Sequence, residues 1–261
     1  MDALLITPIP AFEDNYLWLL ERSSHSVIVD PGDAAAVERV LTQRRLRLDA
    51  ILVTHHHFDH VGGIAALLRA HDVPVYGPAT EAPRIPGLTQ ALREGDRVAL
   101  PTLGVELGVM EVPGHTLGHI AYVADAFVLC GDTLFSAGCG RLFEGTAAQL
   151  HGSLARLAAL PAATRVYCTH EYTRSNLAFA RAVEPGRAAV EAELRRIEAL
   201  RAAGHPSLPS TIGHERDINP FLRCGDPAVV AAASRRAGRP VGPGLETFTA
   251  LRQWKDGFRA P

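Results

Sequence analysis

The feature that most constrains this chain is a histidine-rich segment, Thr-His-His-His-Phe-Asp-His, at residues 54–60. It holds four of the chain's 12 histidines and follows the β-branched run AILVT, which is typical of a strand. In extended backbone, residues i and i+2 point the same way, so His55 and His57 can bind one metal ion while His56 points elsewhere. The segment therefore predicts a metal site at a junction between a strand and a helix that begins near Val61.

Further candidate ligands lie inside this segment and after three later strands. Asp59 and His60 stand at the entry to the predicted helix and can turn toward a second metal ion. His115 in PGHTLGH, Asp132 in LCGDTLF and His170 in YCTHEY each follow a predicted strand. Strand ends gather at one rim of a sheet, so we expect these side chains to meet. Imidazole and carboxylate are ligand types that Zn²⁺, Mn²⁺ and Fe²⁺ share.

Composition limits the class of protein. The chain has 261 residues, of which 47% are hydrophobic and 21% charged, which is ordinary for a globular chain with a full core. No apolar run approaches the roughly 20 residues that a membrane helix needs. The first residues, MDALLITPIPAFEDNY, have no basic region ahead of an apolar stretch, so we expect no secretory signal and a cytoplasmic protein. The cysteines form no C-x-x-C pair and are expected to be reduced thiols. They are Cys130, Cys139, Cys168 and Cys224.

The predicted secondary structure and the balance of charge both change near residue 170. Residues 1–169 mix strand-like runs with helical stretches, whereas helical patterns dominate residues 170–261. The first part holds 12 Arg against 18 Asp or Glu, and the second holds 14 Arg or Lys against 10 Asp or Glu. We therefore expect a metal-binding catalytic domain at 1–169 and an α-helical domain at 170–261 whose positive charge suits an anionic substrate.

The order of these motifs resembles that of the metallo-β-lactamase superfamily, which runs T-H-x-H-x-D-H, then G-H, then a bridging Asp, then a late His. The resemblance covers residues 1–170 and implies an α+β fold, an αββα sandwich with a dinuclear metal site. It implies that His55, His57 and His115 hold one metal ion, that Asp59, His60 and His170 hold the other, and that Asp132 bridges both. Asp59 and Asp132 are thereby the expected catalytic carboxylates, while His119 is expected to be structural.

Such a site suits hydrolysis. Two metal ions about 3.5–4 Å apart can share a water molecule and activate it at neutral pH. The chain has no G-x-S-x-G motif, so no serine nucleophile is indicated. We expect two divalent ions per chain, with zinc first and iron or manganese as alternatives.

Five segments outside the metal ligands resemble glyoxalase II, the hydroxyacylglutathione hydrolase family. They are IPAFEDNYLWLL, FSAGCGRLFEGT, THEYTRSNLAFARAVEP, INPFLR and LRQWKDGF, and they span the whole chain. The resemblance implies a thioester hydrolase that converts S-D-lactoylglutathione to D-lactate and glutathione, the second step of methylglyoxal detoxification.

The same resemblance places glutathione on basic and aromatic side chains. By motif position these are Arg141, Phe143, Tyr172, Arg252 and Lys255. Arg offers a planar fork to a carboxylate and Lys a point charge, which suits a tripeptide with two carboxylates. Some relatives carry Tyr at position 143, so Phe143 can pack against the substrate but cannot donate a hydrogen bond.

Other functions fit less well. A glutathione-linked persulfide dioxygenase of the same fold would lack the helical part, and a nuclease would carry basic patches that a net charge of -2 does not offer. A lactamase has no use for a glutathione-binding extension, and a non-catalytic metal-binding protein would not need a full ligand set. We expect a monomer with a small-molecule substrate and no nucleic-acid or membrane partner.

Overall fold

The computed structural model describes residues 2–259, which form two compact units. One unit comprises the chain up to Glu111 together with Gly118–Gly131, and the other comprises Val112–Leu117 and the chain from Asp132 onward. No helix in the described range is long and apolar enough to cross a bilayer.

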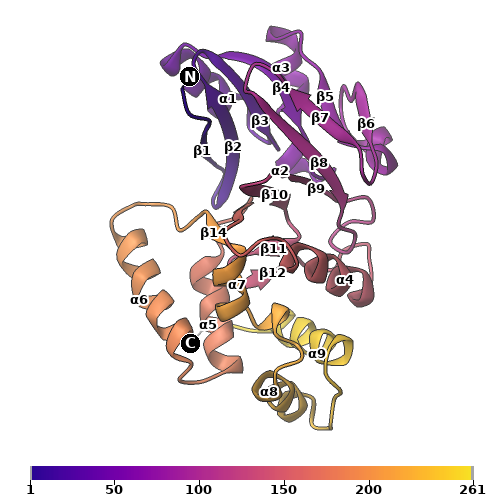
Figure 1. Ribbon diagram of the computed structural model, residues 1–261, viewed down its shortest axis with the longest axis vertical. Helices are drawn as coiled ribbons and strands as arrows, with labels where there is room; N and C mark the ends of the chain where they lie inside the picture. The colour runs from indigo at the N-terminus through magenta and orange to yellow at the C-terminus, as the bar shows by residue number, and fades with distance from the viewer. Residues whose placement is uncertain (1, 260–261) are drawn as a thin grey trace. The chain divides into compact units, whose positions relative to one another are not determined.

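The first unit is built on a six-stranded sheet in the order β1-β2-β3-β4-β5-β6 (Figure 1). Strands β1 to β3 are antiparallel neighbours, and β3 to β6 run parallel. The strands are β1 Leu5–Ala11, β2 Asn15–Arg22, β3 His25–Val29, β4 Arg47–Leu52, β5 Val75–Pro78 and β6 Gln90–Leu92. Parallel pairing needs crossover connections, and helices α1 (Ala34–Arg44) and α3 (Ile64–Ala70) supply them.

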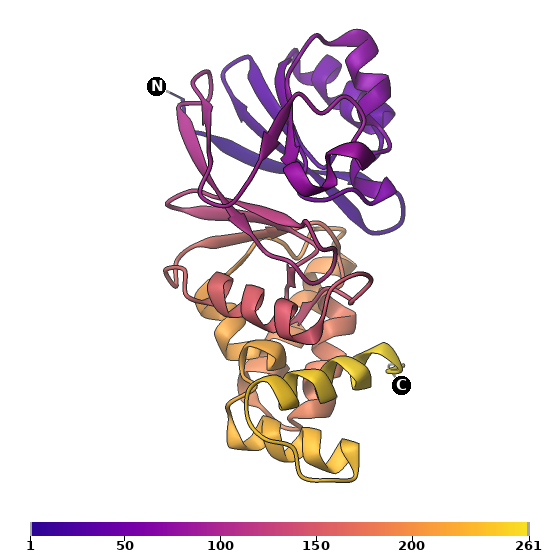
Figure 2. The same cartoon turned by 90° about the vertical axis from the view of Figure 1, so that its right-hand side faces the viewer.

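A hydrophobic core lies between these helices and the sheet. Apolar side chains of β2, β3 and β4 meet those of α1 and α3, because both helices place an apolar stripe toward the strands. The helices of this unit are visible beside its strands in Figure 2. Fully buried members of this core include Leu17, Leu19, Ile28, Val37, Ile51, Ile64 and Leu67. Helix α1 begins at Asp33, whose side chain accepts hydrogen bonds from the next turn, as a helix N-cap does.

A second, antiparallel group of strands completes the first unit. It runs in the order β10-β9-β8-β7, with β7 Arg97–Leu100, β8 Val105–Glu111, β9 Ile120–Val123 and β10 Phe127–Gly131. Tyr122 of β9 donates its hydroxyl to Val53 O at 2.9 Å, and Ile120 N donates to Thr54 O at 3.0 Å. These bonds tie the antiparallel strands to the end of β4, where the histidine-rich segment begins.

The second unit is mainly helical. It contains a two-stranded hairpin, β11 (Leu134–Phe135) and β12 (Gly138–Cys139), and the antiparallel pair β13 (Arg165–Cys168) and β14 (Ser210–Thr211). Its helices are α4 Ala147–Ala158, α5 Thr173–Val183, α6 Ala188–Ala202, α7 Ile212–Ile218, α8 Pro227–Ala237 and α9 Leu245–Asp256. A cluster of buried rings forms part of its core, in which Phe221 stacks on Phe179 and contacts Phe248 edge-on.

Most elements lie where the sequence patterns predict them, with two differences. The helix expected from Val61 instead begins at Phe58 and is divided at two glycines into α2 (Phe58–Val61) and α3. Helix α7 follows a stretch whose prolines, Pro206 and Pro209, indicate a loop, and the short strand β14 precedes it. The functional division at residue 170 stays a prediction, since compact units need not coincide with a catalytic and a recognition domain.

Candidate functional site

The histidine-rich segment is held in place by Asp30, which directly follows β3. Thr54 donates to the Asp30 carboxylate from its backbone nitrogen (2.7 Å) and its hydroxyl (2.8 Å), and Asp30 itself has a positive φ of 52°. The adjoining loop packs tightly against the segment, because a Cβ on Gly32 would lie 1.9 Å from the carbonyl oxygen of Asp59. The segment Val-Asp-Pro-Gly at residues 29–32 therefore positions the predicted metal ligands. Its sequence alone did not indicate this role.

The three consecutive histidines diverge as extended backbone predicts. His55 Nε2 lies 3.1 Å from His57 Nδ1, so the two imidazoles converge. His56 turns to Glu81, whose carboxylate accepts from the His56 backbone nitrogen and lies 2.7 Å from its Nδ1. His119 is fully buried and stacks on His55 with ring centroids 4.5 Å apart, which fits its expected structural role.

Asp59 and His60 form a second small group in the same unit. Their Oδ2 and Nε2 atoms are 3.4 Å apart, and Asn15 donates to the same Asp59 oxygen at 2.9 Å. The other ring nitrogen of His60 lies 3.1 Å from Asp30 Oδ2. A carboxylate behind a histidine ring is the usual way in which proteins orient a metal-binding imidazole.

In the second unit, Asp132 lies between the two remaining histidine candidates. Its Oδ2 is 3.4 Å from His115 Nε2 and 3.3 Å from His170 Nε2, and all three side chains are buried. His115 Nδ1 lies 2.9 Å from the carbonyl oxygen of Arg141, which can only accept a hydrogen bond. A neutral His115 therefore presents the Nε2 lone pair to a carboxylate oxygen.

This arrangement fits a cation. Two acceptors that face each other at 3.4 Å repel, and a metal ion bound by both removes that repulsion. Each unit thus offers imidazole nitrogens and carboxylate oxygens of the kind that bind divalent metal ions.

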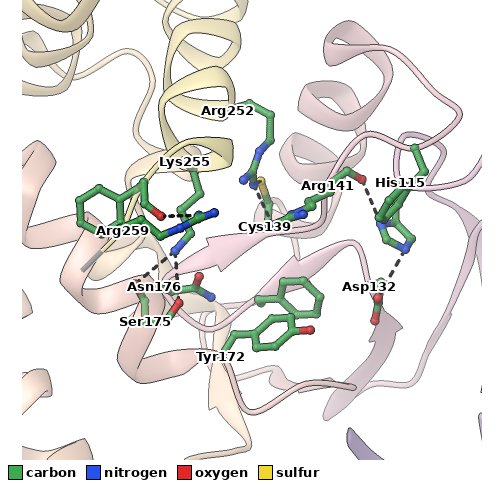
Figure 3. A pocket seen from close by; sticks show the side chains of 13 residues that line it. His115, Asp132, Cys139, Arg141, Tyr172, Ser175, Asn176, Arg252, Lys255 and Arg259 are labelled. Carbon is green, nitrogen blue, oxygen red and sulfur yellow. Dashed lines mark hydrogen bonds and ion pairs between the residues drawn. The ribbon is translucent and has the colours of Figure 1, made fainter. Parts of the chain in front are cut away.

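A cavity of about 480 Å³ opens in the second unit (Figure 3). His115 and Asp132 stand at one end of it, Lys255 and Arg259 at the other, and Tyr172 between them. The lining is completed by Phe135, Cys139, Arg141, Phe143, Ser175, Asn176, Arg252 and Phe258. All five residues that the sequence predicts to bind glutathione line this cavity, which also contains two of the predicted metal ligands.

Arg252 is buried and makes several hydrogen bonds, although it was expected to offer its fork to a substrate. Its Nη1 donates to the carbonyl oxygens of Cys139 (3.0 Å) and Gly140 (3.4 Å). Its Nε and Nη2 both donate to Asp256 Oδ1, at 3.2 and 2.9 Å. At most one of the five guanidinium N–H groups is then left for a ligand.

Lys255 lies one helical turn away and remains directed into the cavity. Its Nζ lies 3.2 Å from the carbonyl oxygen of Ser175 and 5.4 Å from the centre of the Phe179 ring. Burial first, and then the positive charges of Arg252 and Arg141, lower the pKa of Lys255 to about 8. A buried ammonium surrounded by other cations is stabilised by an anionic ligand.

Aromatic side chains line the wall between the two ends. Tyr172 stacks on the His170 ring at 4.7 Å, and Phe135 packs edge-on against both rings. Phe143 is 63% exposed and contacts His115 edge-on, with centroids 5.2 Å apart. These faces suit an elongated ligand with apolar and amide groups.

Buried polar groups fix the hairpin Leu134–Cys139 that forms one side of the cavity. Glu215 of α7 accepts from the backbone nitrogen of Ala137 at 2.7 Å, and Asn219 donates to two hairpin carbonyls at 3.2 and 2.9 Å. Asn176 of α5 donates to a third carbonyl at 3.0 Å. Burial raises the pKa of Glu215. No signal in the sequence indicates this role of Glu215, because its partner Ala137 lies far away along the chain.

Comparisons with known proteins agree with this architecture. Residues 12–170 match a family model described as the metallo-beta-lactamase superfamily, and residues 171–258 match one described as hydroxyacylglutathione hydrolase C-terminus. A protein of Cupriavidus taiwanensis is 57% identical over 98% of this chain and its own full length. A protein of Alkalilimnicola ehrlichii is 54% identical over 96% of this chain and 98% of its own. Both carry the name hydroxyacylglutathione hydrolase.

Solved structures give the same fold. The chain is similar to the BLEG-1 B3 metallo-beta-lactamase, with a TM-score of 0.63 and 26% identity over 84% of this chain and 99% of that one. It is also similar to TTHA1623 in a di-iron-bound form, with a TM-score of 0.58 and 29% identity over 85% of this chain and all of that one. ETHE1 from Myxococcus xanthus, at 24% identity and a TM-score of 0.64, covers 99% of this chain and 92% of its own and bears on the fold alone. The predicted α+β sandwich with a helical C-terminal part is confirmed.

Proposed function

Since the chain belongs to the hydroxyacylglutathione hydrolase family of the metallo-β-lactamase superfamily, we propose that it hydrolyses S-D-lactoylglutathione to D-lactate and glutathione. One observation in the structure supports this proposal independently of the family match. A single cavity has the metal-ligand candidates His115 and Asp132 at one end and cationic side chains at the other. A thioester at the first end and carboxylates at the second would match that polarity.

We propose a dinuclear metal site with the ligand set that the order of the motifs implies. His55, His57 and His115 would hold the first ion, Asp59, His60 and His170 the second, and Asp132 would bridge them. The order of the motifs supports this assignment, as do the short distances within each unit. The donor set of imidazoles and carboxylates suits zinc, and it also accepts iron or manganese.

Bound metal ions would supply Lewis acidity, by which water is activated and the charge that develops on the thioester oxygen is stabilised. The chain's own contribution is to orient the ligands. Asn15 fixes one oxygen of Asp59, and the carbonyl of Arg141 fixes the ring of His115. Asp59 and Asp132, as carboxylate ligands, are the proposed catalytic residues.

Recognition of glutathione would lie at the far end of the cavity. The tripeptide carries two carboxylates and one ammonium, so it is a net anion. Arg141 and Lys255 would contact a carboxylate, while Tyr172 and Phe143 would pack against the peptide. Arg252 would act mainly by bracing the wall, because its N–H groups are largely occupied. The division into a catalytic part at 1–169 and a recognition part at 170–261 remains part of this proposal.

We further propose a cytoplasmic monomer without nucleic-acid or membrane partners. The four cysteines are buried free thiols, which suits a reducing compartment.

The test is hydrolysis of S-D-lactoylglutathione by the metal-loaded protein, followed at the thioester absorbance. A β-lactam, a phosphodiester and glutathione persulfide with oxygen uptake serve as competing substrates. We expect thioester cleavage to exceed the other reactions by several orders of magnitude. Faster turnover of any competing substrate would refute the proposed function.

A further inference from the structure

The cationic end of the cavity contains a further cationic residue, Arg259, to which the family motifs assign no role. Arg259 follows α9 and lines the cavity beside Lys255, at the end remote from Asp132 (Figure 3). Its side chain is exposed, and its Nη1 donates to the carbonyl of the adjacent Phe258 at 3.3 Å. This local bond orients the guanidinium and leaves most of its N–H fork for a ligand.

The other cations do not suffice for two carboxylates. Arg252 directs its donors to Asp256 and to backbone carbonyls. Lys255 has a pKa of about 8, so part of its population is neutral in mildly alkaline solution. Arg141 can serve one carboxylate together with Lys255. A guanidinium keeps its charge at any working pH, so Arg259 is suited to the second carboxylate.

We propose that Arg259 binds one of the two carboxylates of the glutathione moiety, a proposal that rests on the proposed thioester substrate. Lys255 and Arg259, four residues apart at the end of α9, would then divide the anionic groups between them. Because this contact lies far from the scissile bond, it holds the ground state and the transition state about equally. Its loss should raise KM and leave kcat nearly unchanged.

The test compares Arg259→Gln, which removes the charge, with Arg259→Lys, which keeps it. Arg239→Gln is the matched control, because Arg239 is also exposed and also donates only locally, to Pro240 O at 3.2 Å, but does not line the cavity. Three thioesters are assayed: S-D-lactoylglutathione and the S-D-lactoyl derivatives of γ-glutamylcysteinamide and of 4-aminobutanoylcysteinylglycine. Each shorter compound lacks one of the two terminal carboxylates.

We expect Arg259→Gln to raise KM for the full substrate about 3- to 10-fold. This range lies between the loss expected for an exposed ion pair and the loss expected for a buried charged hydrogen bond. Arg259→Lys should recover part of this loss, and Arg239→Gln should match the wild type. The effect of Arg259→Gln should fall below about twofold for the one shorter thioester that lacks the bound carboxylate, which identifies that carboxylate.

Two results would overturn the subsite: a KM for Arg259→Gln equal to that of Arg239→Gln, or an equal rise for all three thioesters. Failure of the proposed function is distinguishable, because the wild type would then not cleave S-D-lactoylglutathione at all. In that case, calorimetric titration with S-methylglutathione decides the subsite. A Kd that Arg259→Gln leaves unchanged rejects it, and a 3- to 10-fold weaker Kd supports it.

Discussion

Lys255 should titrate within the range of an ordinary enzyme assay, because burial and two nearby arginines lower its pKa from 10.5 to about 8. In the free enzyme the ammonium is then about 90% populated at pH 7 and about 10% at pH 9. An anionic substrate binds the charged form better. The affinity that Lys255 contributes is therefore fully present well below pH 8 and is lost as pH rises through about 8.

The size of the effect follows from this population. A charge-assisted hydrogen bond contributes about 1.5–3 kcal/mol, so the charged form binds roughly 10- to 150-fold better than the neutral form. Weighted by the two populations, KM for S-D-lactoylglutathione should rise about 5- to 9-fold between pH 7 and pH 9. Measuring KM separately from kcat removes most of the titration that belongs to the metal site.

Two variants control this measurement. Lys255→Arg carries a permanent charge, so its KM should be nearly constant over the same pH range. Lys255→Met has no charge, so its KM should be high at both pH values. A small thioester without carboxylates should show no dependence with the wild type. If the wild-type KM for S-D-lactoylglutathione is the same at pH 7 and pH 9, Lys255 does not bind the substrate in its charged form.

Three further outcomes are expected. Elemental analysis should find close to two metal ions per chain, with Asp132→Ala depleting both and His170→Ala mainly one; full occupancy in Asp132→Ala would exclude a bridging role. Glu215→Ala should lower the free energy of unfolding by about 1–3 kcal/mol, since it leaves a buried hairpin N–H without its acceptor. In urea titrations, Glu215→Gln should recover part of the lost stability. Equal stability of the wild type and both variants would contradict this role of Glu215. The hydrogen bond to Glu193 raises the pKa of His214, while hydrogen bonds from Arg196 and then from His214 outweigh desolvation and lower the pKa of Glu193 to about 2. The stabilisation from the His214–Glu193 pair should therefore fade as pH rises through the raised His214 pKa, and again as pH falls from about 4.5 toward 2. Stability curves of His214→Gln and wild type that stay parallel from pH 5 to 9 would argue against the pair.

Elements with strong local signals could be predicted from the sequence alone. Helix α8 is an example, because Pro227 suits a first helical turn and Gly238, with a φ of 67°, suits the position after the last residue of a helix. The metal-ligand candidates could also be found, because His and Asp at successive strand ends form a pattern that chance composition rarely produces. In both cases, the information lies within a few residues of the feature.

The remaining features depend on partners that are distant in the sequence. Glu215 stands in a polar heptapeptide, yet it is fully buried because the backbone of Ala137, 78 residues earlier, turns toward it. The same contact helps to explain why α7 forms after a proline-containing stretch that suggests a loop. Asp30 is similar, since its partner Thr54 lies 24 residues further along the chain. No local pattern carries such pairings.

Arg252 and Lys255 show how two cations on one helix acquire different roles. Three residues apart, they look in the sequence like a pair of equivalent anchors. In the structure Arg252 binds the carbonyls of Cys139 and Gly140, so it joins α9 to the strand that leads into Arg141. Its charge is also the largest cause of the lowered Lys255 pKa after burial. The residue that braces the pocket therefore also sets the pH range in which its neighbour binds an anion, and replacing it changes both properties at once.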